Sequence, residues 1–223
     1  MRTSNLRRKP HAFTLIEMIG VLAVIAILAS LLVPKIFESI ANAHMSQTVL
    51  SCQTIKTAVM EHYAKFLSIA SSNGEANLSF VPNSPNPPSF TNFDSVLLAE
   101  GLIDKPFAPK IGSSATIQLV DISGLASSTQ AKFKNSGGSN GAYDLDGGGD
   151  KNDVTGTVLV EAVIYDVSQA DAQALNNIID GPTLGEAAST GTPDKDDVGR
   201  VIYGAPHGQN SGLYEVHIYI THH

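Results

Sequence analysis

The feature that most constrains this chain is an uninterrupted apolar run near its start. Residues 13–33 read FTLIEMIGVLAVIAILASLLV and contain a single ionisable side chain, Glu17. As an α-helix this run would be roughly 31 Å long, which matches the hydrocarbon core of a bilayer. A core helix of a soluble protein usually keeps a polar face, whereas residues 18–33 offer only Ser30. The run therefore predicts a membrane-spanning helix.

The charges around the run predict how it is oriented. Four basic residues precede it and no acidic residue does: Arg2, Arg7, Arg8 and Lys9. Because basic flanks stay in the cytoplasm, we expect a single span with the rest of the chain on the outer side. A cleaved signal peptide would end in small residues after its apolar core. Here the core is followed by VPKIF, which argues against that interpretation.

Composition excludes several classes of function. The 223 residues include 14 Lys and Arg and 21 Asp and Glu, a net charge of −7. The chain beyond the basic start is more acidic still, so we expect no nucleic-acid partner, because phosphates require cationic neutralisation. A single cysteine, Cys52, excludes an intramolecular disulfide framework. Nucleophile-elbow, zinc-protease, phosphate-loop and dinucleotide motifs are absent from the sequence, so we expect no enzyme.

Glu17 is the informative residue of the apolar run. A carboxylate inside a membrane helix costs at least a few kcal/mol, so it marks a functional site by default. If the chain were cut between Ala12 and Phe13, the new amine of one subunit could pair with Glu17 of a neighbour or of its own chain. Such a pair would favour a matched axial register, since an unpaired charge is costly there. The alternative is an acid at the headgroup boundary that favours the helix dipole.

Residues 7–17, RRKPHAFTLIE, resemble the processing site of type IV prepilins and type II secretion pseudopilins, and the resemblance extends to about residue 36. It implies that a prepilin peptidase cuts between Ala12 and Phe13 and methylates the amine of Phe13. It also implies that Glu17 is the assembly carboxylate, and that the helix leaves the inner membrane through an assembly platform to form a filament of self-associated and other pilin-like subunits. Ala12 departs from the usual Gly, and its methyl group predicts slower processing.

Pro34 lies late in the same helix. It lacks an amide proton, so the carbonyl of Ser30 loses its helical donor and a loosened turn is expected at 30–34. The resemblance implies that this part of the helix stretches in the filament. The alternative is an ordinary membrane-helix proline, with the freed carbonyl satisfied by a neighbour.

Beyond Pro34, apolar residues recur every three or four positions up to Phe66, which predicts an amphipathic helix packed on a sheet. Cys52 lies on this stripe as a small buried apolar residue. Further helices are expected at 93–100 and at 168–180, the latter with Ser168 and Asp171 as a capping box and Gly181 beyond its end. Strands are expected at 116–122, 157–167, 200–203 and 213–221, the last half-buried, with Glu215, His217 and Tyr219 on its polar side.

These elements predict an α+β fold in which a long helix lies on a small antiparallel sheet of about four strands. The pilin-like resemblance implies the same architecture. The chain divides into a leader at 1–12, a transmembrane and assembly helix at 13–35, its amphipathic continuation at 36–72 and a globular head at 73–223.

One stretch of the head carries possible metal ligands. Residues 142–153, AYDLDGGGDKND, place hard oxygen donors around a glycine turn: Asp144, Asp146, Asp150, Asn152 and Asp153. Calcium takes six to eight such oxygens, and the DxDG start resembles an EF-hand loop, although the twelfth position lacks Glu. The alternative is an acidic, glycine-rich turn. The family resemblance extends to calcium, on which some pseudopilins depend. His217, His222 and His223 offer either a transition-metal site or exposed residues at a strand end.

Two functions follow from the sequence. The first is a structural subunit of a type II secretion pseudopilus or a type IV pilus, present in the inner membrane and then in a periplasmic or surface filament. The absence of a disulfide loop favours a pseudopilin, or a pilin without disulfides. The second is a monomeric, membrane-anchored extracytoplasmic binding module that captures calcium or another ligand.

Overall fold

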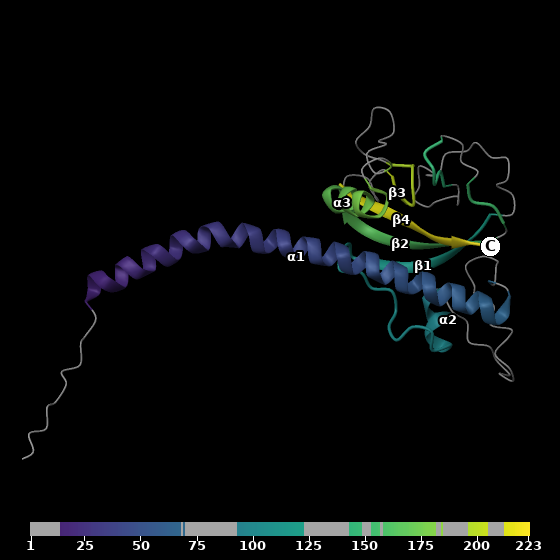
Figure 1. The fold of residues 1–223 in the computed structure, drawn as a ribbon, viewed down its shortest axis with the longest axis horizontal. Helices are drawn as coiled ribbons and strands as arrows, with labels where there is room; N and C mark the ends of the chain where they lie inside the picture. The colour runs from purple at the N-terminus through teal and green to yellow at the C-terminus, as the bar shows by residue number, and fades with distance from the viewer. Residues whose placement is uncertain are drawn as a thin grey trace, which may run out of the picture. The chain divides into compact units, whose positions relative to one another are not determined.

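The computed structural model is α+β, with three helices and four strands among the residues it describes (Figure 1). Those residues are 14–67, 69, 93–122, 143–148, 153–156, 158–181, 184, 196–204 and 212–223. The helices are α1 (Leu15–Phe66), α2 (Phe93–Ala99) and α3 (Gln169–Ile179), and the strands are β1 (Ser114–Asp121), β2 (Val158–Ser168), β3 (Val201–Tyr203) and β4 (Leu213–His222). The chain forms two compact units, which divide after Ala43 within α1.

Helix α1 is continuous for 52 residues and passes through Pro34. It ends at Phe66, earlier than the residue-72 boundary that the sequence predicts. Leu67 explains the end, because its φ of 53° is in the left-handed region that stops an α-helix. The amide of Leu67 still donates to the carbonyl of Tyr63 at 2.7 Å, which closes the last turn. Residues 70–92, which include the predicted proline-rich loop, lie outside the described residues.

The four strands form one antiparallel sheet in the order β1-β2-β4-β3. All four predicted strands are present, with bounds that differ by at most two residues where the ends are described. Register shifts interrupt the β2–β4 pairing, one of them between Ile164 and Val167. At this bulge Asp166 has a φ of 56°, an uncommon conformation for a residue with a side chain. The hydroxyl of Ser113 donates to the Asp166 carboxylate at 2.5 Å and ties the bulge to the start of β1.

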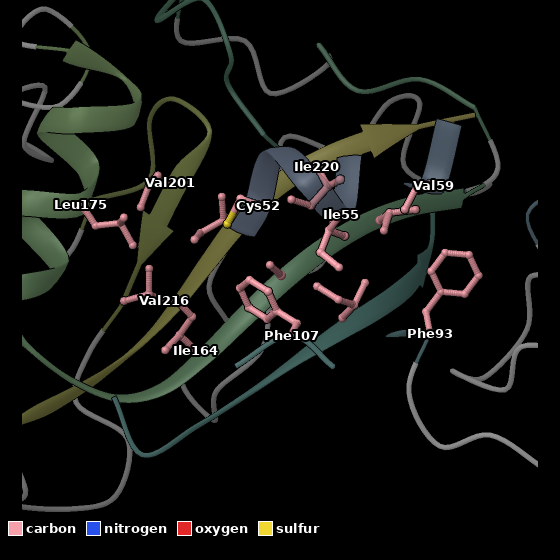
Figure 2. Close-up of a cluster of buried hydrophobic side chains, with 14 of the residues drawn as sticks. Cys52, Ile55, Val59, Phe93, Phe107, Ile164, Leu175, Val201, Val216 and Ile220 are labelled. Atoms are coloured by element: carbon pink, nitrogen blue, oxygen red, sulfur yellow. The ribbon is translucent and has the colours of Figure 1, made fainter. Parts of the chain in front are cut away.

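The main core lies between one face of this sheet and residues 44–66 of α1. Figure 2 shows Cys52, Ile55 and Val59 on the helix, facing side chains of the sheet such as Ile164 and Ile220. These helix residues recur at three- and four-residue spacing, while alternate residues of β2 and β4 face them. The thiol of Cys52 is the buried apolar group expected from sequence, and burial raises its pKa to about 12.

Helix α3 begins as its sequence predicts. Ser168 is the N-cap, and its hydroxyl accepts the amide proton of Asp171 at 3.2 Å. The return contact differs from a regular capping box, because the Ser168 hydroxyl also donates to the Asp171 carboxylate at 2.8 Å. Asp180 is the C-cap, and Gly181 follows it with a φ of 75°, the left-handed conformation common after a helix end. Ala172 and Leu175 of α3 join the main core.

The opposite face of the sheet, called the outer face here, is also buried. Its apolar cluster comprises Ile122, Tyr143, Val154, Leu159 and Ile202. The prediction that β4 is only half-buried is therefore wrong: Glu215 and His217 on its polar side are 6% and 1% exposed. The physical reason is a second layer, because Tyr143 and Val154 pack over a face that alternation alone assigns to solvent.

Candidate functional site

The first candidate site is the start of the apolar helix. The predicted cleavage-site residues Ala12 and Phe13, the latter also the predicted methylation site, lie outside the described residues. From Met18 to Val33 the helix is apolar on every side apart from Ser30, and each residue from 14 to 43 is exposed. Helix α1 is long and apolar enough to cross a membrane, and its most apolar window is not buried within the chain at all. Exposed apolar surface of this extent needs lipid or other protein around it.

Glu17 is held in a capping box with Thr14. The Glu17 Oε2 atom accepts both the backbone amide of Thr14 at 2.8 Å and its hydroxyl at 2.7 Å. In return the Thr14 hydroxyl oxygen accepts the amide of Glu17 at 3.3 Å. Two N–H groups of the first helical turn thereby gain partners, and the carboxylate lies near the positive end of the helix dipole. The helix-start role and the assembly role are thus compatible, since one carboxylate can serve both in turn.

Sequence reasoning missed this box, although its signal was present. Thr14 and Glu17 are three residues apart directly before an apolar run, which is the spacing of a capping box. The same pattern led to the correct assignment of Ser168 and Asp171. Pro34, the other predicted assembly residue, lies inside α1 without ending it. Near it, the Ser30 hydroxyl donates to the carbonyl of Ile27 at 2.7 Å.

The second candidate site is the acidic turn of the head. Asp144, Asp146 and Asp153 each offer a carboxylate oxygen, and these oxygens lie within 4.8 Å of one another. Asp150 and Asn152, the other predicted ligands, lie outside the described residues. The three acids differ in exposure: Asp144 is buried, Asp153 is half-buried and Asp146 is exposed. The structure therefore brings together three of the five predicted calcium ligands.

The same carboxylates also shape the turn. Asp153 Oδ2 accepts the amides of Leu145 at 2.6 Å and Asp146 at 3.1 Å. Asp144 Oδ1 accepts the amide of Gly147 at 2.8 Å, and Asp146 Oδ1 accepts that of Gly148 at the same distance. Gly147 has a φ of 76°, which favours glycine at this position. These bonds explain the turn without a cation, while the hard oxygen donors suit calcium.

The histidines proposed as a transition-metal set do not share one role. His217 lies between two carboxylates on the outer face. The ring of His223 stacks on Tyr63 of α1 with 3.9 Å between ring centroids. His222 Nδ1 lies 2.7 Å from the hydroxyl of Tyr219.

Comparison with known proteins adds one finding. Residues 7–33 match a family model described as the prokaryotic N-terminal methylation motif. No curated protein and no solved structure matches the chain. The match covers the basic segment, Ala12, Phe13, the Thr14–Glu17 box and the apolar run, and it ends just before Pro34.

The match has a definite meaning for this chain. The motif implies processing by a prepilin peptidase and assembly with other pilin subunits. Among the described residues one helix is apolar enough to cross a membrane, which fits a membrane-anchored, single-pass protein. The long helix and the four-stranded antiparallel sheet are a pilin-like α+β architecture. Residues 7–33 are therefore a type IV prepilin-like signature, which supports a type IV pilin or pseudopilin-like precursor.

Proposed function

We propose that this chain is a structural subunit that is cut between Ala12 and Phe13 and polymerises through its N-terminal helix into a filament. The filament is a type II secretion pseudopilus or a type IV pilus, with the head on the outer side of the inner membrane. The observation that carries the proposal is the apolar, fully exposed first half of α1 directly after a matched methylation motif. Lipid covers this surface before assembly, and the helices of neighbouring subunits cover it afterwards.

Glu17 gives the assembly its register. In the single chain its carboxylate has Thr14 as a local partner. After cleavage, the amine of Phe13 in a neighbouring subunit is a stronger partner, because a full positive charge attracts the carboxylate more than the uncharged donors of Thr14 do where water is scarce. Assembly then exchanges the local bonds for an ion pair between subunits. The pair forms only when the two helices are correctly offset along the filament axis.

The test compares Glu17→Ala with Glu38→Ala, because both acids are exposed residues of α1. Intact mass and N-terminal sequencing report processing, and electron microscopy of sheared cell fractions reports filaments. We expect both variants to begin at a methylated Phe13, while Glu17→Ala loses at least tenfold in filament yield and Glu38→Ala keeps it. Normal filaments from Glu17→Ala would contradict the proposed mechanism. A chain that retains residues 1–12 would contradict processing and favour the anchored monomer.

A second candidate function is a cation-dependent head, favoured by the convergence of Asp144, Asp146 and Asp153. Calcium would take oxygens from these residues, from Asp150 and Asn152, and from water, and would order the turn. This role is compatible with a filament subunit and equally with a monomeric, membrane-anchored binding module. The N-terminal test above separates those two cases.

Calcium binding is tested by calorimetry on the full chain in detergent after treatment with a chelator. Asp146→Asn is the informative variant, because the side chain is exposed and asparagine keeps the hydrogen bond to Gly148 while losing the charge. Asp104→Asn is the control, since Asp104 is an exposed acid of the head outside this group. We expect wild type and Asp104→Asn to bind calcium and Asp146→Asn to bind at least tenfold more weakly. If calcium produces no heat of binding with any of the three proteins, the acidic turn has a structural role only.

A further inference from the structure

Three ionisable side chains are buried together on the outer face of the sheet. Glu161 comes from β2, and Glu215 and His217 come from β4; their side chains are at most 8% exposed. His217 Nδ1 lies 3.1 Å from Glu161 Oε1, and His217 Nε2 lies 3.1 Å from Glu215 Oε1. One imidazole ring therefore bridges two carboxylates, with each ring nitrogen directed at one of them.

With both carboxylates ionised, this geometry requires a protonated ring. A neutral imidazole has one N–H donor and one acceptor nitrogen, whereas an ionised carboxylate only accepts. Only the imidazolium can donate to both acids at once. Burial by itself lowers the pKa of His217, but the charge and hydrogen bond of Glu161, together with those of Glu215, outweigh it and raise the pKa to about 9.

A tyrosine connects this triad to the segment that covers the outer face. The hydroxyl of Tyr143 donates to Glu161 Oε2 at 2.8 Å, so the two oxygens of Glu161 serve His217 and Tyr143. Tyr143 is fully buried, and its ring meets that of Tyr219 at a centroid distance of 5.6 Å. It begins the segment 143–148, which is also tied down by the amide of Gly199 donating to the Asp144 carbonyl at 2.7 Å.

Other groups around the triad come from each neighbouring strand. On β2, burial and then the charges of Glu215 and Glu161 raise the pKa of Tyr165. From β1, the side-chain amide of Gln118 donates to the Tyr165 hydroxyl at 2.9 Å. On β3, Ile202 is paired with His217 and is apolar. Among the described residues, phenols and apolar side chains lie around the two acids, and the proton on His217 offsets the charge of these acids.

We propose that Glu161, His217 and Glu215 form a proton-operated latch that holds the segment 143–148 on the outer face of the sheet. While the imidazolium is present, its positive charge balances the negative charge of Glu161, and the second oxygen of Glu161 accepts the hydrogen bond that holds Tyr143. Loss of the proton leaves two buried carboxylates beside a neutral ring, and water must reach Glu161 to solvate it. Water reaches it by displacing Tyr143. The outer cluster is separate from the main core, so the segment opens without unfolding the α1 side of the sheet.

The test uses the full chain in detergent micelles. Nuclear magnetic resonance of ¹³C-labelled histidine follows the seven histidines across the alkaline range. Hydrogen exchange, corrected for its intrinsic pH dependence, follows residues 143–148 and, as an internal reference, the buried face of α1. We expect one histidine to titrate near pH 9 and the protection of 143–148 to fall at least tenfold over the same range. Protection of α1 should be unchanged.

Two variants assign the effect to the latch. His217→Gln has a side chain of similar length that cannot carry the charge, so at neutral pH the segment should exchange as fast as that of wild type at high pH. His62→Gln is the matched control, because His62 is also fully buried and also paired with a glutamate, Glu100 at 2.8 Å, but in the main core. It should leave the protection of 143–148 unchanged. Glu215→Gln should lower the pKa of His217 and move the opening to lower pH.

Either of two wild-type results would overturn the latch: no histidine of the folded chain protonated at neutral pH with a pKa near 9, or equal corrected exchange of 143–148 below and above that value. Both are measured on the unmodified chain, so they remain decisive even if His217→Gln fails to fold.

Discussion

The two halves of α1 differ in the burial of their apolar side chains, although they form one continuous helix. Residues 15–43 expose apolar side chains on every side, whereas residues 44–66 bury one face, including Ile55 and Val59, against the sheet. Secondary structure is the same in both halves. The difference teaches that the second half contributes to the stability of the chain itself, whereas the apolar surface of the first half is left for lipid or for other subunits.

The sharpest test of this comparison is one substitution made in each half. Ile55→Ala removes a side chain that is 3% exposed, and we expect it to lower the free energy of unfolding of the head by ~2–5 kcal/mol. Ile25→Ala removes the same side chain where it is 55% exposed, and the expected change is within about 0.5 kcal/mol. Urea unfolding of the full chain in micelles, followed by near-ultraviolet circular dichroism, measures both. All six tyrosines lie beyond residue 44, so this signal reports the head. A similar loss from both variants would break the comparison.

The free energy of unfolding of the head should also depend on pH, because His217 lies in the head. The pKa of His217 is raised from 6.5 to about 9 in the folded state, so its stabilisation is complete below 6.5 and is lost as pH rises through about 9. A shift of this size corresponds to about 3 kcal/mol as an order of magnitude. Urea midpoints measured between pH 6 and 10 should fall for wild type, and the slope should flatten in His217→Gln. An unchanged midpoint across this range would contradict the charge assigned to His217.

A smaller effect is expected at the start of α3. Ser168→Ala removes the hydroxyl that accepts the amide of Asp171, and it should lower head stability by about 1 kcal/mol. Ser168→Asp should recover most of the loss, because aspartate is also a good N-cap. Both are measured by the same urea experiment. Failure of Ser168→Asp to recover would point instead to lost packing.

The smallest effect is expected at the exposed end of α1. Lys65 and Glu61 form a pair at 3.0 Å, and both side chains are about half exposed. Lys65→Gln should therefore change the free energy of unfolding by at most about 0.5 kcal/mol, and high salt should abolish the difference. A loss comparable to that of Ile55→Ala would mean that solvent-facing residues of this half matter as much as buried ones.

Much of the fold was predictable because it is encoded locally. The apolar run, the spacing of core residues on α1, the cap at Ser168 and the four strands each follow from a period or a turn signal within a few residues. The end of α1 was predicted too late, because Leu67 adopts a left-handed conformation that no glycine announces. Three of the five predicted calcium ligands converge because they lie within one short turn.

The outer face could not be predicted in this way. Alternation in β4 assigns Glu215 and His217 to solvent. Glu161 interrupts the apolar residues 158–164 of β2, and nothing in the sequence indicates its partner. Their burial depends on Tyr143, which is 18 residues from Glu161 in sequence, and on a contact between Glu161 and His217 across 56 residues. Long-range pairs of this kind leave no periodic signal.

The sequence by itself determined the properties of the N-terminal segment, which do not depend on a tertiary fold. An apolar run long enough to cross a membrane, a methylation motif and an acid within that run are properties of consecutive residues, because each depends only on neighbours in the sequence. Only the tertiary structure decided that the head has two buried faces, and that two acids and a histidine share one of them. The reason is that the energy of a buried charge depends on which distant groups surround it, and folding alone brings those groups together.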